Sequence, residues 1–496
     1  MAVAVAQGAV PSATSIPAEA YSWWGSGDTD FSTPGNWKVG DEIATEPLTA
    51  DTLAAVGNAG GTLTFSSDQS VSNLWITKTS TFDLGGHALD VRQRMYLCTT
   101  ASFSYPSITF TNGTVRCCDN FQLNYGPNDT SYYYGKAYVQ GPGTTLAVGG
   151  KTFLQGRGAV LDVAGGATFV STNTVDMHSK AVGVTLNIRG QGTTAEFLKG
   201  FQIGGAQSTL AVTDGAVLNV SGIGNASYQN RNVIGRTDNS NKLLIDNATV
   251  NYCMTTGVNL NIGDHDNGRV VGPNYLIVTN NGVLNMPKGG DIRCGVSVGQ
   301  SSIIHGSHVI AADGGKLESA GGVYLGAGQA MSCGGHFLEA DDGTIVVKNL
   351  RTGTAVHDSN SVVRVSGRRG CIKLTAASSP CVLNCSAIVC FEIPAEGFNE
   401  VPLQVPNGGV TSALAGTLAP LRLQVSARDF AKAHPSTSVT LISSGADSTA
   451  VFTELIENVE FVDTPEDRRG TLAISDDGKS LLYTTPARKG LCILFR

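Results

Sequence analysis

A repeat of about 30 residues constrains the fold of this 496-residue chain more than any other feature. In one register, an apolar residue precedes glycine at Ile203-Gly204, Ile234-Gly235, Ile262-Gly263, Val298-Gly299 and Leu325-Gly326, with successive spacings of 31, 28, 36 and 27. In a second register, two strand-like runs flank the polar pairs Asp214-Gly215, Asp246-Asn247, Asn280-Asn281, Asp313-Gly314 and Asp341-Asp342. A fixed period of this length is typical of repeat proteins in which each unit packs on its neighbours.

The apolar residues that follow these polar pairs report the same period independently. Leu218, Val250, Leu284, Leu317 and Ile345 follow one another at spacings of 32, 34, 33 and 28. Apolar and polar residues alternate around them, as expected for strands with one buried face. Because Asp and Asn suit the left-handed backbone of tight turns, we interpret the polar pairs as corners rather than as catalytic carboxylates.

Such strands occur both in propeller blades and in coils of a β-solenoid. A blade needs about 40 to 50 residues and four antiparallel strands, which is longer than the units here. Three short strands fit one coil of a parallel β-helix, and 61 glycines with only 15% charged residues agree with many tight turns. We therefore predict an all-β fold, a right-handed parallel β-helix (β-solenoid) of roughly eleven coils.

Both ends of the chain differ in composition from the repeat, which predicts caps over the exposed strand edges. We expect a leader remnant or disordered arm over residues 1–20, a Trp-rich N-terminal cap over 21–60, the β-helix over 61–396 and a small mixed β cap over 397–496. Within the C-terminal cap, residues 427–434 form an amphipathic stretch, and the turn at Asp476-Asp477-Gly478 predicts a closing hairpin.

Charge and hydropathy argue against several classes of function. The 33 basic and 40 acidic residues give a net charge of −7, which argues against broad binding to nucleic acid. No apolar run approaches the roughly 18 to 20 residues of a transmembrane segment. The eleven cysteines match neither a zinc motif nor a redox pair, so we assign no metal and no cofactor from them.

Three parts of the chain resemble secreted bacterial β-solenoid proteins of the autotransporter-passenger-like type. They are the Trp23-Trp24-Gly25 and Gly35-Asn36-Trp37 opening, the strand–turn–strand units, and the ending Asp476-Asp477-Gly478-Lys479-Ser480 with Gly490-Leu491-Cys492-Ile493-Leu494-Phe495. The resemblance implies a secreted or cell-surface protein used in adhesion, as a scaffold or in polysaccharide contact. Relatives by fold include polysaccharide lyases and hydrolases. The roughly 100 residues after the repeat are too few for the translocator barrel of true autotransporters, so we expect export by another route.

One glycine-bounded segment, residues 263–269, interrupts the repeat with Asp264, His265 and Asp266 beside an arginine. Its carboxylates could hold calcium, or His265 could act as a base, so these three residues are candidate catalytic residues. The spacing does not match the EF-hand loop, and a solvated loop between coils is the alternative. We therefore predict no metal site here.

A basic segment follows over residues 348–373, with Lys348, Arg351, Arg364, Arg368, Arg369 and Lys373. Binding of an anionic glycan needs cations to neutralise its carboxylates, and a lyase also needs a base beside them. The six cations are therefore candidate substrate-binding residues, with His357 and Arg368 as candidate catalytic residues. Solvated charges on one face of the solenoid are the alternative.

These observations favour a secreted or cell-surface protein with a structural, adhesive or carbohydrate-binding role, whose partner is an extracellular polysaccharide or another cell-surface ligand. The alternative is a polysaccharide lyase or glycoside hydrolase that acts along one face of the β-helix. A homo-oligomer of the trimeric fibre or tailspike-like adhesin kind is a further alternative. Convergence of His, Lys, Arg and carboxylates in one cleft would favour the enzyme, whereas dispersed charges would favour the binding protein.

Overall fold

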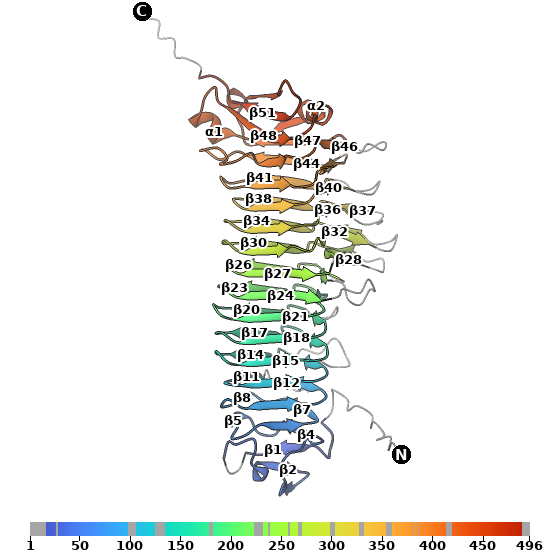
Figure 1. Cartoon of the computed structure of the whole chain (residues 1–496), viewed down its shortest axis with the longest axis vertical. Helices are drawn as coiled ribbons and strands as arrows, with labels where there is room; N and C mark the ends of the chain where they lie inside the picture. Colours follow the sequence, from blue (N-terminus) through green and yellow to red (C-terminus); the bar gives the residue numbers. More distant parts are fainter. Residues whose placement is uncertain are drawn as a thin grey trace, which may run out of the picture. The chain divides into compact units, whose positions relative to one another are not determined.

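The computed structural model of the chain describes residues 16–25, 28–97, 106–124, 134–177, 182–222, 232–236, 239–255, 258–265, 270–297, 303–326, 332–353, 360–378, 380–384, 386–412 and 419–488. The chain forms two compact units, Met1–Asn230 and Arg231–Arg496. Within each unit, short parallel strands stack coil upon coil (Figure 1). This arrangement confirms the predicted all-β parallel β-helix.

In the first unit, seven described coils each contribute one strand to three parallel sheets, which we call A, B and C. Sheet A consists of β4 (Leu53–Val56), β7 (Asn73–Ile76), β10 (Met95–Leu97), β13 (Phe121–Leu123), β16 (Thr152–Leu154), β19 (Val175–Met177) and β22 (Phe201–Ile203). Sheet B consists of β5 (Gly61–Thr64), β8 (Ser80–Asp83), β11 (Ser107–Thr111), β14 (Lys136–Gln140), β17 (Val160–Ala164), β20 (Thr185–Arg189) and β23 (Thr209–Thr213). Sheet C consists of β6 (Gln69–Val71), β9 (Ala88–Val91), β12 (Thr114–Cys117), β15 (Thr145–Val148), β18 (Thr168–Ser171), β21 (Thr194–Phe197) and β24 (Val217–Gly222).

The coils of the first unit are shorter than the sequence repeat indicated. In sheet A, the registers Ala54–Leu74, Leu74–Met95, Met95–Phe121, Phe121–Thr152, Thr152–Val175 and Val175–Phe201 give residue-number offsets of 20, 21, 26, 31, 23 and 26. Three-strand coils also begin at Leu53, ahead of the expected start at residue 61. Shorter coils over a longer range explain why seven coils are described in each unit, instead of roughly eleven in all.

A small aromatic cluster lies at the start of the first unit. β1 (Tyr21–Trp23) pairs antiparallel with β2 (Trp37–Val39), which follows η1 (Pro34–Asn36) and pairs with β3 (Glu42–Ile43). Trp23 and Trp37 are buried, with ring centroids 5.2 Å apart, and Phe31 lies 4.8 Å from Trp37. Trp24 is 46% exposed, and the Lys38 ammonium lies 3.5 Å from its ring centroid. Two of the three clustered tryptophans therefore bury apolar area over the first coils.

The second unit repeats the plan over seven described coils. Its sheet A consists of β25 (Asn232–Ile234), β28 (Leu260–His265), β32 (Ile292–Ser297), β36 (Val323–Leu325), β40 (Leu350–Thr352), β43 (Cys381–Leu383) and β46 (Val410–Ser412). Its sheet B consists of β26 (Lys242–Asp246), β30 (Tyr275–Thr279), β34 (His308–Ala312), β38 (Phe337–Asp341), β41 (Val362–Ser366), β44 (Ile388–Glu392), β47 (Arg422–Ser426) and β49 (Val459–Phe461). Its sheet C contains β27 (Thr249–Met254), β31 (Val283–Met286), β35 (Lys316–Ser319), β39 (Thr344–Val347), β42 (Cys371–Leu374), β45 (Leu403–Val405) and β48 (Ser438–Ser444).

In three coils of the second unit, the connection from sheet A to sheet B contains an extra strand. These strands, β29 (Val270–Val271), β33 (Ile303–His305) and β37 (Ser332–Gly334), pair in parallel as a fourth sheet, D. β33 packs against β28 and β32 of sheet A. Strands of two or three residues are too short to show an alternating pattern, so the sequence did not predict sheet D.

Parallel pairing in the second unit continues to Ser444 in sheet C and to Phe461 in sheet B, beyond the expected end of the β-helix at residue 396. The amphipathic stretch 427–434 contains α1 (Arg428–Ala433), and α2 (Thr449–Glu457) and η2 (Glu466–Arg468) follow. As predicted, a hairpin closes the cap: β50 (Thr471–Ile474) pairs antiparallel with β51 (Ser480–Thr484), which pairs with β48. No helix in the described part of the chain has the length and apolarity needed to cross a membrane.

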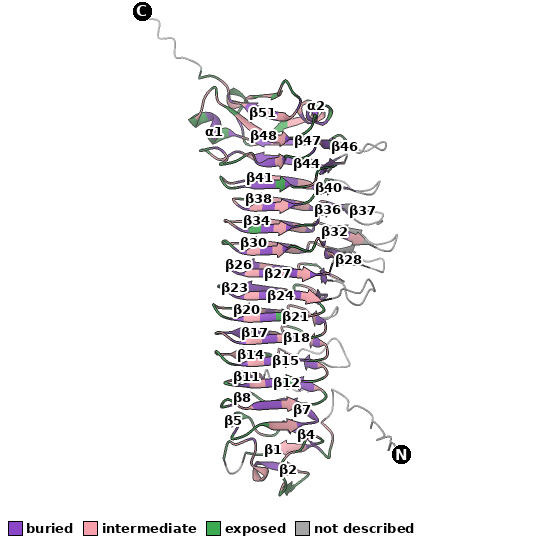
Figure 2. Ribbon diagram, viewed as in Figure 1, coloured by how far each residue is buried: buried purple, intermediate pink, exposed green. Residues whose placement is uncertain are grey.

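Alternating side chains build the core of each unit, as the buried and partly exposed residues along each strand show (Figure 2). Val250, Leu284, Leu317 and Ile345 pair in register within sheet C and are fully buried, as their spacing predicted. The corner prediction is also confirmed, because each polar pair contains a residue with positive φ. These residues are Asp214 (57°), Asn247 (48°), Asn280 (50°), Asn281 (61°), Asp313 (49°) and Asp342 (54°).

The glycine register lies within or directly after the sheet A strands. Gly235, Gly263 and Gly326 have φ values of 80°, 68° and 78°, a left-handed conformation that glycine adopts at little cost. In the coil before Gly326, the corresponding residue is Gly295, with φ of 69°, whereas Gly299 lies outside the described residues. The steps from Gly263 to Gly295 and from Gly295 to Gly326 are 32 and 31 residues. They match the coil lengths in sheet A better than the predicted spacings of 36 and 27.

Candidate functional site

Of the three loop candidates, only Asp264 has a described side chain, and it is buried. Asp264 lies near the end of β28, is 3% exposed, and its Oδ2 accepts a 2.7 Å hydrogen bond from Asn261 Nδ2. The side chain of His265 and the whole of Asp266 lie outside the described residues. In the described ranges, no three His, Cys, Asp or Glu residues are placed to hold a metal ion, so nothing there supports calcium. A buried, hydrogen-bonded Asp264 stabilises the end of its strand.

The basic segment is distributed over three sheets of the second unit. Arg351 lies on β40 of sheet A, Arg364 on β41 of sheet B and Lys373 on β42 of sheet C. Lys348 precedes β40 at one corner, and Arg368 and Arg369 lie at the corner between β41 and β42. His357 lies outside the described residues. The six cations therefore do not converge, because the segment covers nearly one full coil and winds around every face.

Ion pairs already neutralise two cations of this segment. Arg364 contacts Glu339 at 3.4 Å and also pairs with Glu392, whose hydrogen bond raises the pKa of Arg364. Arg369 pairs with the corner residue Asp342, and this hydrogen bond lowers the pKa of the Asp342 carboxyl. These two arginines link neighbouring coils.

The outer face of sheet A in the second unit brings together residues from consecutive coils. Asn261 pairs in register with Arg293, Arg293 with Tyr324, and Tyr324 with Arg351. Their strand neighbours on either side are fully or almost fully buried, so the row that they form points outward. We call Arg293, Tyr324 and Arg351 the sheet A row.

Within the sheet A row, Arg293 forms an ion pair and Arg351 forms none among the described residues. The Arg293 guanidinium lies 5.7 Å from the Tyr324 ring centroid, and its Nη2 is 2.9 Å from Asp291 Oδ2. Arg351 is exposed, and it forms no ion pair with a carboxylate in the part of the chain that the structure describes. A cation, an aromatic ring and a second cation therefore follow one another at the coil spacing of about 4.8 Å.

Sequence reasoning identified Arg351 but missed Arg293 and Tyr324. All three stand two residues before a positive-φ glycine, namely Gly295 within β32, Gly326 directly after β36 and Gly353 directly after β40. The glycine register could therefore have located the row. Arg293 was missed because the sequence analysis assigned Val298-Gly299, and not Gly295, to that register.

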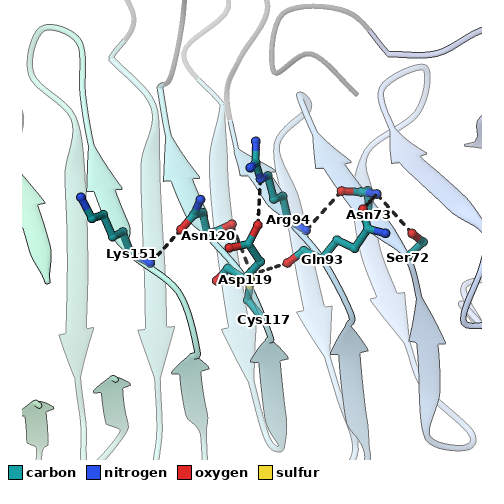
Figure 3. Close-up of polar contacts among 8 residues, drawn as sticks. All are labelled: Ser72, Asn73, Gln93, Arg94, Cys117, Asp119, Asn120 and Lys151. Carbon is teal, nitrogen blue, oxygen red and sulfur yellow. Dashed lines mark hydrogen bonds and ion pairs between the residues drawn. The ribbon is translucent and has the colours of Figure 1, made fainter. Parts of the chain in front are cut away.

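In the first unit, part of the corresponding outer face is covered by the chain itself. Trp75 and Tyr96 stack with ring centroids 5.1 Å apart, are fully buried, and contact Ile16 and Leu53. At the nearby corner, polar side chains join successive coils (Figure 3). Asn73 Nδ2 donates to Gln93 Oε1, Arg94 Nε donates to Asp119 Oδ2, and Asn120 Oδ1 accepts from the Lys151 amide, at distances of 3.1, 2.9 and 2.8 Å. This corner is structural.

A pocket of about 430 Å³ lies in the second unit between β46 and α2. Its polar lining includes Thr411, Ser412, Asp447, Thr449 and Glu454. Asp447 Oδ1 accepts hydrogen bonds from the amide and hydroxyl of Thr449, which lower the pKa of Asp447, and Glu454 Oε1 accepts from the Leu421 amide. Both carboxylates are thus engaged in holding the cap.

Comparison of the chain with protein-family models, curated proteins and solved structures gave no match. Function therefore has to be inferred from the geometry of the described faces.

Proposed function

We propose that this protein is a secreted or cell-surface β-helix, of the autotransporter-passenger-like type, that binds an extended anionic polysaccharide along sheet A of the second unit. The observation that carries the proposal is the sheet A row, with exposed Arg351 one coil beyond Tyr324 and Arg293 one coil before it. Arginine presents a planar fork of donors that fits carboxylate or sulfate groups.

The spacing of the row suits a polymer better than a small ligand. Arg293 and Arg351 are two coils apart, or about 10 Å, along the direction in which strands stack. A sugar chain lying in that direction would meet one cation at each end of this span, with the Tyr324 ring between them. Because Arg351 is exposed, its attraction for the polymer should weaken as salt increases.

The enzyme alternative has less support from the described residues. A lyase needs a basic group beside the bound uronate. Asp264 is buried and hydrogen-bonded to Asn261, and Arg368 lies at a corner between sheets B and C rather than on sheet A. Neither of these two described candidates adds a base to the sheet A row, so the row itself supports binding.

The test is a binding titration of the full chain against polygalacturonate, alginate and a sulfated glycosaminoglycan at low and high salt. We expect Arg351→Ala to weaken binding about tenfold, the effect of losing one charge-assisted hydrogen-bond pair. Lys316→Ala is the matched control, because it removes a partly exposed cation from sheet C, and it should stay within about twofold. Lack of binding to all three polymers, or unchanged binding by Arg351→Ala, would refute the proposal, and unsaturated product in the same mixtures would show a lyase.

A further inference from the structure

A strip of apolar and aromatic side chains covers the outer face of sheet B in the second unit. It runs over consecutive coils and consists of Leu244, Tyr275, Ile277, His308, Ile310, Phe337, Val362 and Ile388. All eight side chains are partly exposed and alternate with fully or almost fully buried residues. We call these eight residues the sheet B strip.

The fold itself does not require an apolar surface at these positions. In sheet B of the first unit, the equivalent outward positions are mostly polar: Lys136, Thr185, Thr209, Thr109, Asp162 and Asn187. Contiguous apolar surface of this kind is typical of sites where another macromolecule docks. We therefore infer that another macromolecule docks on the strip.

The aromatic rings of the strip cover one another's faces. Tyr275 and His308 stack with centroids 4.9 Å apart, and His308 and Phe337 stack at 4.5 Å with an interplanar angle of 3°. Lys242 approaches Tyr275 as well, with its ammonium 5.9 Å from the ring centroid. Since ring edges rather than ring faces point outward, the strip suits a flat apolar protein surface better than a sugar ring.

Two charged residues of sheet B that adjoin the strip are arranged in a self-complementary order. Glu339 and Arg364 occupy the same outward position on neighbouring strands, β38 and β41. On the two preceding strands of sheet B, the same position holds Ile310 and Ile277. On the two following strands it holds Cys390 and Gln424. A two-fold rotation about an axis along the strands, between β38 and β41, reverses this order and brings Glu339 of one copy onto Arg364 of the other.

We propose that two copies of the chain associate through the sheet B strip in this antiparallel order. The rotation also brings Phe337 onto Val362 of the partner subunit, which places apolar side chains together across the interface. From β26 to β47 the outer face of sheet B measures about 30 Å by 16 Å, which is near the lower limit of specific interfaces. We therefore expect association to be weak enough to depend on concentration.

Sedimentation velocity of the full chain, over about a hundredfold range of concentration, tests the proposal. We expect the parent to shift from monomer to dimer. Ile310→Lys should raise the dissociation constant at least tenfold, because a charge would be buried against apolar surface. Asn187→Lys, at the equivalent outward position of the first unit, is the matched control and should associate like the parent. A parent that stays monomeric at all concentrations overturns the proposal.

Charge reversal tests the arrangement separately from folding. Glu339→Arg alone places two guanidinium groups together across the interface, and Arg364→Glu alone places two carboxylates together, so each variant should remain monomeric. An equimolar mixture of the two variants should associate, because every facing pair then has opposite charge. Circular dichroism confirms that each variant is folded. Failure of the mixture to associate while the parent dimerises would overturn the antiparallel order, and self-association of either variant equal to the parent would do the same.

Discussion

Leu284 offers a direct test of how the stacked coils of the second unit hold together. Its side chain on β31 lies between Val250 on the preceding coil and Leu317 on the following coil, and all three are fully buried. Leu284→Ala removes three carbon atoms, which at about 0.8 kcal/mol each lose about 2.4 kcal/mol of transfer free energy. The cavity left between two rigid coils adds to this loss, so we expect about 2.5 to 4 kcal/mol.

Hydrogen exchange of the backbone amides measures this loss where it occurs. Each coil contacts only its neighbours, so the loss should concentrate in β27, β31 and β35. A change of about 3 kcal/mol corresponds to roughly a hundredfold faster exchange of protected amides. Asn285→Ala is the matched control, because Asn285 is the next residue and points outward. Exchange in Leu284→Ala within about threefold of the parent, or an equal effect of Asn285→Ala, would show that stacking of inward side chains does not hold the coils together.

Two further predictions follow from burial. Desolvation raises the pKa of the Cys117 and Cys381 thiols to about 12, and that of Cys371 and Cys390 to about 11. In the native protein near pH 8, an alkylating reagent should therefore modify exposed Cys118 while sparing these four, as peptide mass mapping can show; rapid modification of Cys381 would contradict its burial. Burial between Tyr275 and Phe337 lowers the pKa of His308 below its usual 6.5, so the unfolded chain binds more protons and stability should fall as pH drops through about 6.5. An NMR titration of His308 should give a pKa below 6.5 that rises in Phe337→Ala, and a normal value in the parent would refute this reasoning.

The sequence was most informative where the coil geometry allows few residue types. Corners need a left-handed backbone, so Asp313 and Asp342 were identified correctly as corner residues from their place in the repeat. Buried positions in sheet C need apolar side chains at a fixed distance from each corner, so the sequence spacing placed Leu284 and Leu317 in their correct register. Arg293 was missed because the sequence analysis assigned Gly299, and not Gly295, to the glycine register of its coil.

The candidate site was harder to predict because proximity in a solenoid is not proximity along the chain. Leu350 pairs with Cys381, so equivalent positions of consecutive coils are separated by a whole turn of sequence. Cations spread along a single coil therefore turn outward on different faces, whereas Arg293 and Arg351, two coils apart, share one face. Several charged residues close together in such a sequence therefore predict one coil with charged corners. Residues that act together on one face have to be looked for at positions one coil apart in the sequence.

The outward rows of the second unit are where its sequence has the most freedom, and they differ in character. The core constrains inward residues to similar apolar types in all three sheets, which leaves the outward residues without a structural requirement. Sheet A has a row of cations around an aromatic ring, sheet B has an apolar strip with one central ion pair, and sheet C has Asn251 and Asn285 followed by Glu318. Three chemically different faces on one scaffold are consistent with a protein that binds a polymer on one face while it pairs with another copy on a second. Arg351→Ala and Ile310→Lys should therefore impair separate functions, and loss of both binding and association in either variant would show that the two faces are not independent.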